Sequence, residues 1–176
     1  VSVNFSRLHL RKDDFVEELE RIVRRYDISP NLIEIELTES TVVDNENVLI
    51  DVLARLHKYG FSLSIDDFGS GYSSLGLLKN LPVDIIKLDR TFFAQYRDLA
   101  RAKTVISSMI SMAKNLGIHT VAEGVETREN IELLTDLGCD VVQGYYYARP
   151  MPCDTFSPLL ANSICEEVVP NTAVRF

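Results

Sequence analysis

The sequence has no long apolar run, no surplus of basic residues and no paired cysteines. No stretch approaches the ~18 apolar residues that a membrane-spanning helix needs. The 18 Lys and Arg residues are outnumbered by 26 Asp and Glu residues, and the formal net charge is -8. This balance argues against a broad basic surface for DNA, RNA or membranes. A small phosphate ligand would have to be held through bound cations.

The cysteine pattern indicates a reducing environment. The three cysteines, Cys139, Cys153 and Cys165, are odd in number and have no CxxC spacing, which favours reduced, packed thiols. The first residues show neither the basic n-region nor the apolar h-region of a signal peptide. We therefore expect a cytoplasmic domain, although a parent protein could be anchored to a membrane.

Helical and strand-like segments alternate along the chain. Apolar residues recur at helical spacing at Phe15, Leu19, Ile22, Val23 and Tyr26, at 49–56, and at Val105, Ile106, Met109, Ile110 and Ala113. Strand-like runs lie at 1–5, 33–37, 61–65, 85–88, 119–122 and 141–143. Three helices end at a glycine: Gly60, Gly117 and Gly138. Roughly six βα units predict an α/β fold with a parallel sheet, either doubly wound or a (β/α) barrel.

Polar side chains stand near the carboxyl end of each expected strand. Because alternate strand residues face opposite sides, Asp66 lies on the face opposite to Ile65. The same parity selects Asn4, Glu36, Asp66, Lys87, Glu123 and Gln143. Active sites of parallel α/β folds form at this end of the sheet, so we expect these side chains to meet there.

The expected mouth is rich in carboxylates. Glu39, Asp67 and Glu126 add to it from adjacent loops, and so much negative charge is costly to bury without cations. Oxygen donors without a His or Cys cluster favour Mg²⁺ or Mn²⁺, with Ca²⁺ as an inhibitory substitute. Asp66 and Asp67 could serve two ions ~3.5–4 Å apart, which would clamp a phosphodiester. Metal-dependent phosphodiester hydrolysis follows as a hypothesis.

Each of these residues alone has a plainer explanation. A carboxylate at a strand end is more often a helix cap or a solvated charge. A strand lysine such as Lys87 often lies on an exposed edge. Tyr145 and its neighbours beside Pro150 could stack a guanine base, or could simply pack the rim. The joint pattern, rather than any single residue, favours a site.

Six motifs occur in order and carry a family resemblance. They are Val3-Asn4-Phe5-Ser6, Glu36-Leu37-Thr38-Glu39-Ser40, Asp66-Asp67-Phe68-Gly69-Ser70-Gly71-Tyr72-Ser73-Ser74-Leu75, Ile86-Lys87-Leu88-Asp89, Val121-Ala122-Glu123-Gly124-Val125-Glu126-Thr127 and Gln143-Gly144-Tyr145. Together they resemble the EAL family of cyclic di-GMP phosphodiesterases, up to about Met151. The resemblance implies a TIM-type (β/α) barrel domain, which we place at residues 1–167, followed by a C-terminal tail at 168–176.

The resemblance also implies roles for the residues. The implied metal ligands are Asn4, Glu36, Asp66, Asp67 and Glu123; Lys87 and Glu123 act in catalysis, and Glu39, Glu126 and Gln143 organise the site. Tyr145 and Pro150 are candidate substrate contacts. The segment from Asp67 to Ser74, with Gly69 and Gly71, is expected to be a mobile loop that Glu39 braces and that links the site to a dimer interface.

The implied activity is hydrolysis of cyclic di-GMP to linear pGpG with two Mg²⁺ or Mn²⁺ ions. The implied partners are a second copy of the domain and sensory or GGDEF-type domains in the parent chain, without binding of DNA or RNA polymers. The family's Glu-Ala-Leu segment is expected upstream of Val1, so the barrel here would be incomplete, with about six βα units. A non-catalytic cyclic di-GMP sensor and a dimerisation or signal-relay scaffold remain alternatives.

Overall fold

The computed structural model describes residues 1–10, 12, 14–42, 46–69, 78–93 and 98–161. The expected tail at 168–176, Cys165, and the part of the expected loop from Ser70 to Ser74 lie outside these ranges. Within them, no helix combines the length and apolar character needed to cross a membrane.

One parallel sheet of six strands organises the chain. The strands are β1 (Ser2–Asn4), β2 (Glu34–Thr38), β3 (Ser62–Phe68), β4 (Ile85–Leu88), β5 (His119–Ala122) and β6 (Val141–Val142). Their order in the sheet is their order in the sequence, and every neighbouring pair is parallel. A doubly wound sheet reverses direction at a switch point, whereas a barrel winds one way. The α/β fold and its six strands are confirmed, and the doubly wound alternative is wrong.

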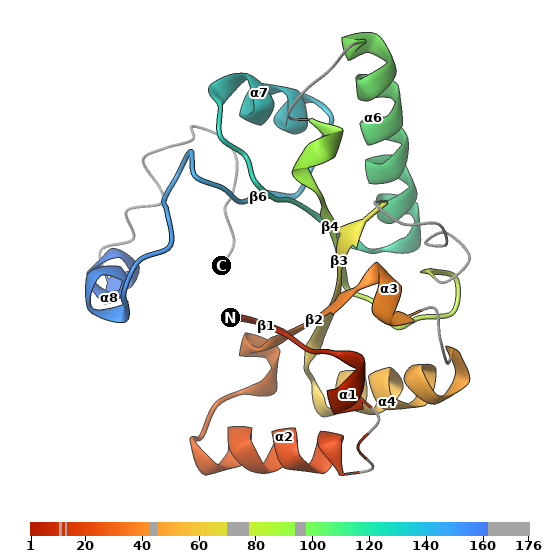
Figure 1. The fold of residues 1–176 in the computed structure, drawn as a ribbon, viewed down its shortest axis with the longest axis vertical. Helices are drawn as coiled ribbons and strands as arrows, with labels where there is room; N and C mark the ends of the chain where they lie inside the picture. The colour runs from red at the N-terminus through yellow and green to blue at the C-terminus, as the bar shows by residue number, and fades with distance from the viewer. Residues whose placement is uncertain (11, 13, 43–45, 70–77, 94–97, 162–176) are drawn as a thin grey trace.

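Most of the helices cover one face of this sheet. They are α1 (Arg7–Leu10), α2 (Phe15–Arg25), α3 (Glu39–Val42), α4 (Glu46–Tyr59), α6 (Leu99–Leu116), α7 (Arg128–Asp136) and α8 (Cys153–Ala161), with 3₁₀ turns η1 (Pro30–Leu32) and η2 (Arg90–Phe92). Figure 1 shows α2, α4, α6 and α7 in an arc along the outside of the sheet, while α8 stands apart. The predicted glycine ends are confirmed, because Gly60, Gly117 and Gly138 all have positive φ.

The core lies between the sheet and the helices. Ile35, Leu63 and Ile86 point outward from the strands and are 0–1% exposed. They pack with the apolar faces of the helices, including Leu53 of α4 and Ile110 of α6. This confirms the expected burial of one strand face and leaves the other face for polar side chains.

The predicted apolar faces of the helices were too wide. Ile22 and Tyr26 are 46% and 63% exposed, and Val105 on α6 is 43% exposed. Helical spacing cannot fix the width of the buried stripe, because that width depends on how closely the neighbouring helix approaches.

Two aspartates hold the amino ends of the strands together. Asp84 stands just before β4, and its Oδ2 accepts a hydrogen bond of 2.8 Å from the backbone N–H of Leu63 in β3. Asp140 stands just before β6 and accepts from the backbone N–H and the hydroxyl of Thr120 in β5, at 2.8 and 2.7 Å. We call Asp84 and Asp140 the foot aspartates. They tie neighbouring strands at the end of the sheet opposite to the candidate site.

Candidate functional site

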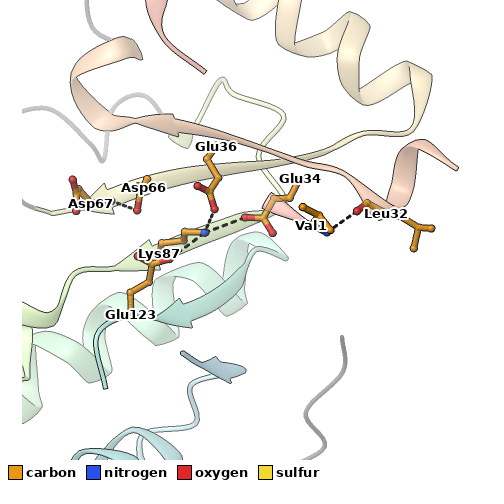
Figure 2. Close-up of polar contacts among 8 residues, drawn as sticks. All are labelled: Val1, Leu32, Glu34, Glu36, Asp66, Asp67, Lys87 and Glu123. Carbon is orange, nitrogen blue, oxygen red and sulfur yellow. Dashed lines mark hydrogen bonds and ion pairs between the residues drawn. The ribbon is translucent and has the colours of Figure 1, made fainter. Parts of the chain in front are cut away.

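A buried lysine on β4 lies at the centre of the candidate site. Lys87 is 4% exposed, and its ammonium donates a hydrogen bond to Oε1 of Glu36 on β2. Its Nζ lies 3.0 Å from Oε1 of Glu123, beyond β5, and 3.5 Å from Oε1 of Glu34 on β2. Figure 2 shows all three carboxylates directed at this one nitrogen. We call these four residues the lysine cluster.

Strand alternation explains why these side chains converge. Ile86 and Leu88 are 0% exposed against the helices, so Lys87 between them points to the opposite face. In the same way, Ile35 faces the helices and directs Glu34 and Glu36 inward. The lysine is therefore an inner residue, and the reading of Lys87 as an edge lysine is wrong.

The cluster keeps Lys87 charged. Burial favours the neutral amine, but the hydrogen bond to Glu36 and the negative charges of Glu123 and Glu34 outweigh it and raise the pKa of Lys87 above its ordinary value. Lys87 is thus a cation at neutral pH. It can act through its charge and its N–H donors, and it cannot serve as a proton acceptor.

Glu123 is a carboxylate of the lysine cluster whose pKa lies above its ordinary value. Burial raises its pKa, and the charges of Asp66 and Glu36 raise it further, against the lowering effect of Lys87. Figure 2 shows Asp66 beside the lysine cluster, on the side toward the carboxyl end of β3. A carboxylate whose proton affinity is raised in this way also gains most from a nearby cation.

The end of β3 carries two adjacent carboxylates in different orientations. The pairing of β3 with β4 shifts register between Ile65 and Phe68, and Asp67 has the left-handed φ of 54°. Such a bulge redirects a side chain that strict alternation would turn to the helices. Asp66 Oδ1 accepts a hydrogen bond of 2.9 Å from the backbone N–H of Asp67. Burial and the charges of Asp66 and Asp89 raise the pKa of Asp67.

Glu39 lies behind the bulge rather than in the lysine cluster. It begins α3, is 5% exposed, and its Oε2 accepts a hydrogen bond of 3.2 Å from the backbone N–H of Gly69. Gly69 has φ of +90°, and a Cβ there would lie 2.6 Å from the ring of Phe92 in η2. The start of the expected loop is therefore fixed by a carboxylate on one side and an aromatic ring on the other.

Glu126 and Gln143 lie on the rim formed by the ends of β5 and β6. The Gln143 carbonyl accepts a hydrogen bond of 3.0 Å from the backbone N–H of Val125, and Arg90 Nη1 lies 3.4 Å from Glu126 Oε1. Gly144 permits this contact, because a Cβ at that position would lie 2.1 Å from the carbonyl oxygen of Val125. The structure thus joins the two loops through their backbones and leaves both side chains exposed.

Three other predicted residues do not contact the lysine cluster. Asn4 is exposed on β1, although it pairs in register with Glu36. Tyr145 is 51% exposed, with the guanidinium of Arg149 stacked 4.6 Å from its ring centroid. Pro150 is also exposed. All three remain candidates on the rim, where a ligand rather than the protein would connect them to the cluster.

Sequence reasoning missed Glu34. It shares the inward parity of Glu36 and stands two residues earlier in β2, so the signal was present. Site residues of parallel α/β folds are expected at the carboxyl ends of the strands, and Glu34 lies before that end of β2. Glu34 lies deeper, and only the three-dimensional structure shows that the Lys87 side chain reaches it.

No group of three His, Cys, Asp or Glu side chains within the described ranges has the arrangement needed to hold a metal ion. The donor chemistry nevertheless fits a hard cation, because the side chains around Lys87 offer only carboxylate oxygens. In this structure the ammonium of Lys87 supplies the positive charge among these carboxylates.

The EAL domain family matches residues 1–150 of the chain. The chain belongs to this family. It is 40% identical over 136 residues to the cyclic di-GMP phosphodiesterase RocR of Pseudomonas aeruginosa, covering 77% of this chain and 35% of RocR. It is 38% identical over 152 residues to the cyclic di-GMP phosphodiesterase NbdA of the same organism, covering 86% of this chain and 19% of NbdA. The EAL chain thus spans about a fifth to a third of these relatives.

Solved EAL structures share the fold. The EAL domain of Mycobacterium smegmatis DcpA superposes with a TM-score of 0.86 at 36% identity, covering 92% of this chain and 72% of DcpA. The PaMucR phosphodiesterase in complex with c-di-GMP gives a TM-score of 0.81 at 35% identity, covering 88% and 63%. Klebsiella pneumoniae BlrP1, solved with manganese and cyclic di-GMP, gives 0.79 at 32% identity, covering 85% and 38%. A second BlrP1 structure contains calcium with the same nucleotide.

Proposed function

We propose that this EAL domain hydrolyses cyclic di-GMP to linear pGpG. The observation that carries the proposal is the lysine cluster itself, in which a buried, charged Lys87 is held by Glu36 and Glu123 at the mouth of the parallel strands. The family membership supplies the substrate class, since relatives and solved homologues are named for cyclic di-GMP.

Metal binding is part of this proposal. The residues that would hold Mg²⁺ or Mn²⁺ are Asn4, Glu36, Asp66, Asp67 and Glu123, whose oxygens suit hard cations. Two bound cations would supply charge to the phosphate and lower the pKa of a water molecule. Ca²⁺ would occupy the same oxygens and inhibit, because its larger radius and looser coordination change the geometry of the attack.

The protein's own groups then have distinct tasks. Lys87, which is cationic at neutral pH, donates hydrogen bonds to the attacking oxygen and stabilises negative charge as it develops on the phosphate. Glu123, whose Oε1 lies 3.0 Å from the Lys87 ammonium, is proposed to accept the proton of the water. The water oxygen bonds to phosphorus as the bond to the 3′ oxygen breaks, and the 3′ oxygen takes up a proton from solvent and leaves as the 3′-hydroxyl of linear pGpG. Glu126 and Gln143 fix the rim loops, and Tyr145 and Pro150 are proposed to contact the guanine base.

The test is turnover by the purified chain, followed by chromatography of the nucleotides. With Mg²⁺ or Mn²⁺ we expect linear pGpG to form, and with Ca²⁺ alone we expect binding without product. Asp66→Asn should abolish turnover, whereas Asp51→Asn, at an exposed position of α4, should leave it unchanged. Failure to form pGpG with Mg²⁺ or Mn²⁺, also by the longer protein that includes the segment expected upstream of Val1, would refute catalysis.

A second candidate is a cyclic di-GMP sensor that does not catalyse. The ion pairs of Lys87 favour it, because the ammonium already neutralises part of the carboxylate charge without a metal ion. Calorimetry distinguishes the candidates: a sensor binds cyclic di-GMP with and without divalent ions and releases no product. A scaffold that only relays signals binds no nucleotide at all.

We also propose that the domain acts as a homodimer within a longer protein that carries sensory or GGDEF-type domains. Val105 and Leu116, about three turns apart on one face of α6, are 43% and 52% exposed and offer an apolar contact surface. Light scattering tests the dimer, and an Asp substitution of Val105 should weaken it.

A further inference from the structure

Three carboxylates contact Lys87, but only two have a proposed role in binding metal. Glu36 and Glu123 belong to the proposed ligands, whereas Glu34 does not. The Glu34 side chain is 18% exposed, and its Oε1 lies 3.5 Å from Lys87 Nζ. Within the described part of the chain this buried oxygen has no hydrogen-bond partner. Within the described residues its desolvation is offset only by the ion pair with Lys87, and this weakly paired buried oxygen needs an explanation.

The position of Glu34 supplies that explanation. It precedes Glu36 by one inward position on β2 and therefore lies nearer the amino end of the strands. Figure 2 shows Glu34 and Asp66 on opposite sides of the Lys87 ammonium, with Asp66 toward the mouth. Glu34 is thus the member of the lysine cluster placed farthest from the cations that the mouth would hold.

Metal binding changes the balance around Lys87. Carboxylates that turn their oxygens to a divalent cation share their charge with it, so Glu36 and Glu123 would attract the ammonium less strongly. The cations would also repel the ammonium directly. A carboxylate behind the lysine would oppose both effects, provided that it is not itself a ligand.

We propose that Glu34 is a positioning residue, which holds the Lys87 ammonium from behind when Glu36 and Glu123 turn to the metal ions. This rests on the proposed function, because it assumes that those two glutamates bind metal. Glu34 acts only through Lys87 and does not touch the substrate. The plainer reading makes the Glu34–Lys87 contact a structural ion pair that stabilises the barrel interior and has no influence on turnover.

The position of the ammonium can be observed without turnover. In protein labelled with ¹⁵N-lysine, the signal of Lys87 Nζ is identified by its absence in Lys87→Met. We expect Glu34→Gln to leave this signal protected from solvent exchange without divalent ions, because Glu36 and Glu123 still hold the ammonium. Addition of Mg²⁺ should expose it in Glu34→Gln only. Protection that persists in Glu34→Gln with Mg²⁺ bound would overturn the proposal.

Kinetics provides an independent readout. We expect Glu34→Gln to lower kcat by about tenfold or more with little change in KM, since the lost interaction positions a group that acts on the transition state. In the Lys87→Met background the same change should have no more than about a twofold effect, because the two residues act as one unit. Equal losses in both backgrounds would show that Glu34 acts independently of Lys87.

Two further variants separate positioning from folding. Glu34→Asp keeps the charge and should recover part of the kcat and of the Nζ protection that Glu34→Gln loses. A merely structural role predicts no difference between the two variants in these measurements. Glu18→Gln, at an exposed position of α2, is the matched control. Absence of turnover in the unsubstituted protein, also when it includes the segment expected upstream of Val1, would refute the proposed function, and the Nζ comparison would then decide the positioning by itself.

Discussion

Replacing Lys87 with methionine tests the electrostatic centre of the site in the metal-free protein. The substitution keeps an unbranched side chain in the core and removes the ammonium from Glu36, which is 6% exposed, and from Glu34 and Glu123. Removing one partner of a buried ion pair costs about 3–5 kcal/mol of unfolding free energy, because the remaining charge is uncompensated. For a domain of this size that loss lowers Tm by roughly 6–20 °C.

Urea denaturation and thermal unfolding at pH 7 without divalent ions measure the loss. Lys103→Met, at an exposed position of α6, is the control and should change stability by less than about 0.5 kcal/mol. Added Mg²⁺ should recover part of the loss, since a cation again faces the carboxylates. A loss of less than about 1 kcal/mol for Lys87→Met would refute the view that the ammonium balances a buried negative cluster.

The pH dependence of this difference has a defined sign. The pKa of Lys87 is raised in the folded state, so its contribution to stability is complete below the pKa of an unfolded lysine, about 10.4, and is lost only as the pH rises through the higher folded value. The difference between the wild type and Lys87→Met should therefore persist from pH 6 to about pH 9. It should shrink as the pH falls, because the pKa of Glu123 is raised and protonation of Glu123 removes a negative charge beside Lys87.

Three further substitutions test other parts of the site. Asp66→Asn should abolish Mn²⁺ binding in calorimetry, because it removes the negative charge of a proposed carboxylate ligand, and an unchanged affinity would exclude Asp66 as a ligand. Glu123→Gln should raise the Tm of the metal-free protein, because burial already disfavours this carboxylate, while reducing the stabilisation by Mg²⁺; a lower Tm would show that its ion pair with Lys87 dominates. Gly144→Ala should destabilise by about 1–3 kcal/mol or more in urea denaturation, since a Cβ would lie 2.1 Å from the Val125 carbonyl oxygen. A stability equal to that of the wild type would show that the rim loops can separate freely.

Much of the fold could be predicted because the spacing of apolar residues distinguishes helices from strands. Strands at 85–88 and 119–122 were predicted with the bounds that the structure has. Alternation along those strands then directed Lys87 inward without any three-dimensional information. The parallel order follows from helices between successive strands, which leave little choice of connection.

Other features depend on contacts that no local pattern contains. The register shift in the pairing of β3 with β4 and the left-handed backbone of Asp67 belong to the contact between two strands, and alternation alone does not predict them. The exposure of Tyr26 depends on where the helix ends relative to its neighbours. The contact of Glu34 with Lys87 could not be predicted, because it depends on how far the Lys87 side chain extends toward the amino end of β2. The roles of the candidate metal and substrate residues remain predictions.

The foot aspartates allow mutations far from the site to affect its geometry. A slip of β3 by one residue against its neighbour would direct Asp66 to the helices and Ile65 to the mouth, since side chains alternate with a period of two. Asp84 resists that slip by holding the backbone of Leu63, far from any residue that would meet the substrate. Mutations at Asp84 or Asp140 should therefore appear in genetic screens as losses of activity at positions remote from the site. Their cause would be misaligned chemistry rather than a missing chemical group.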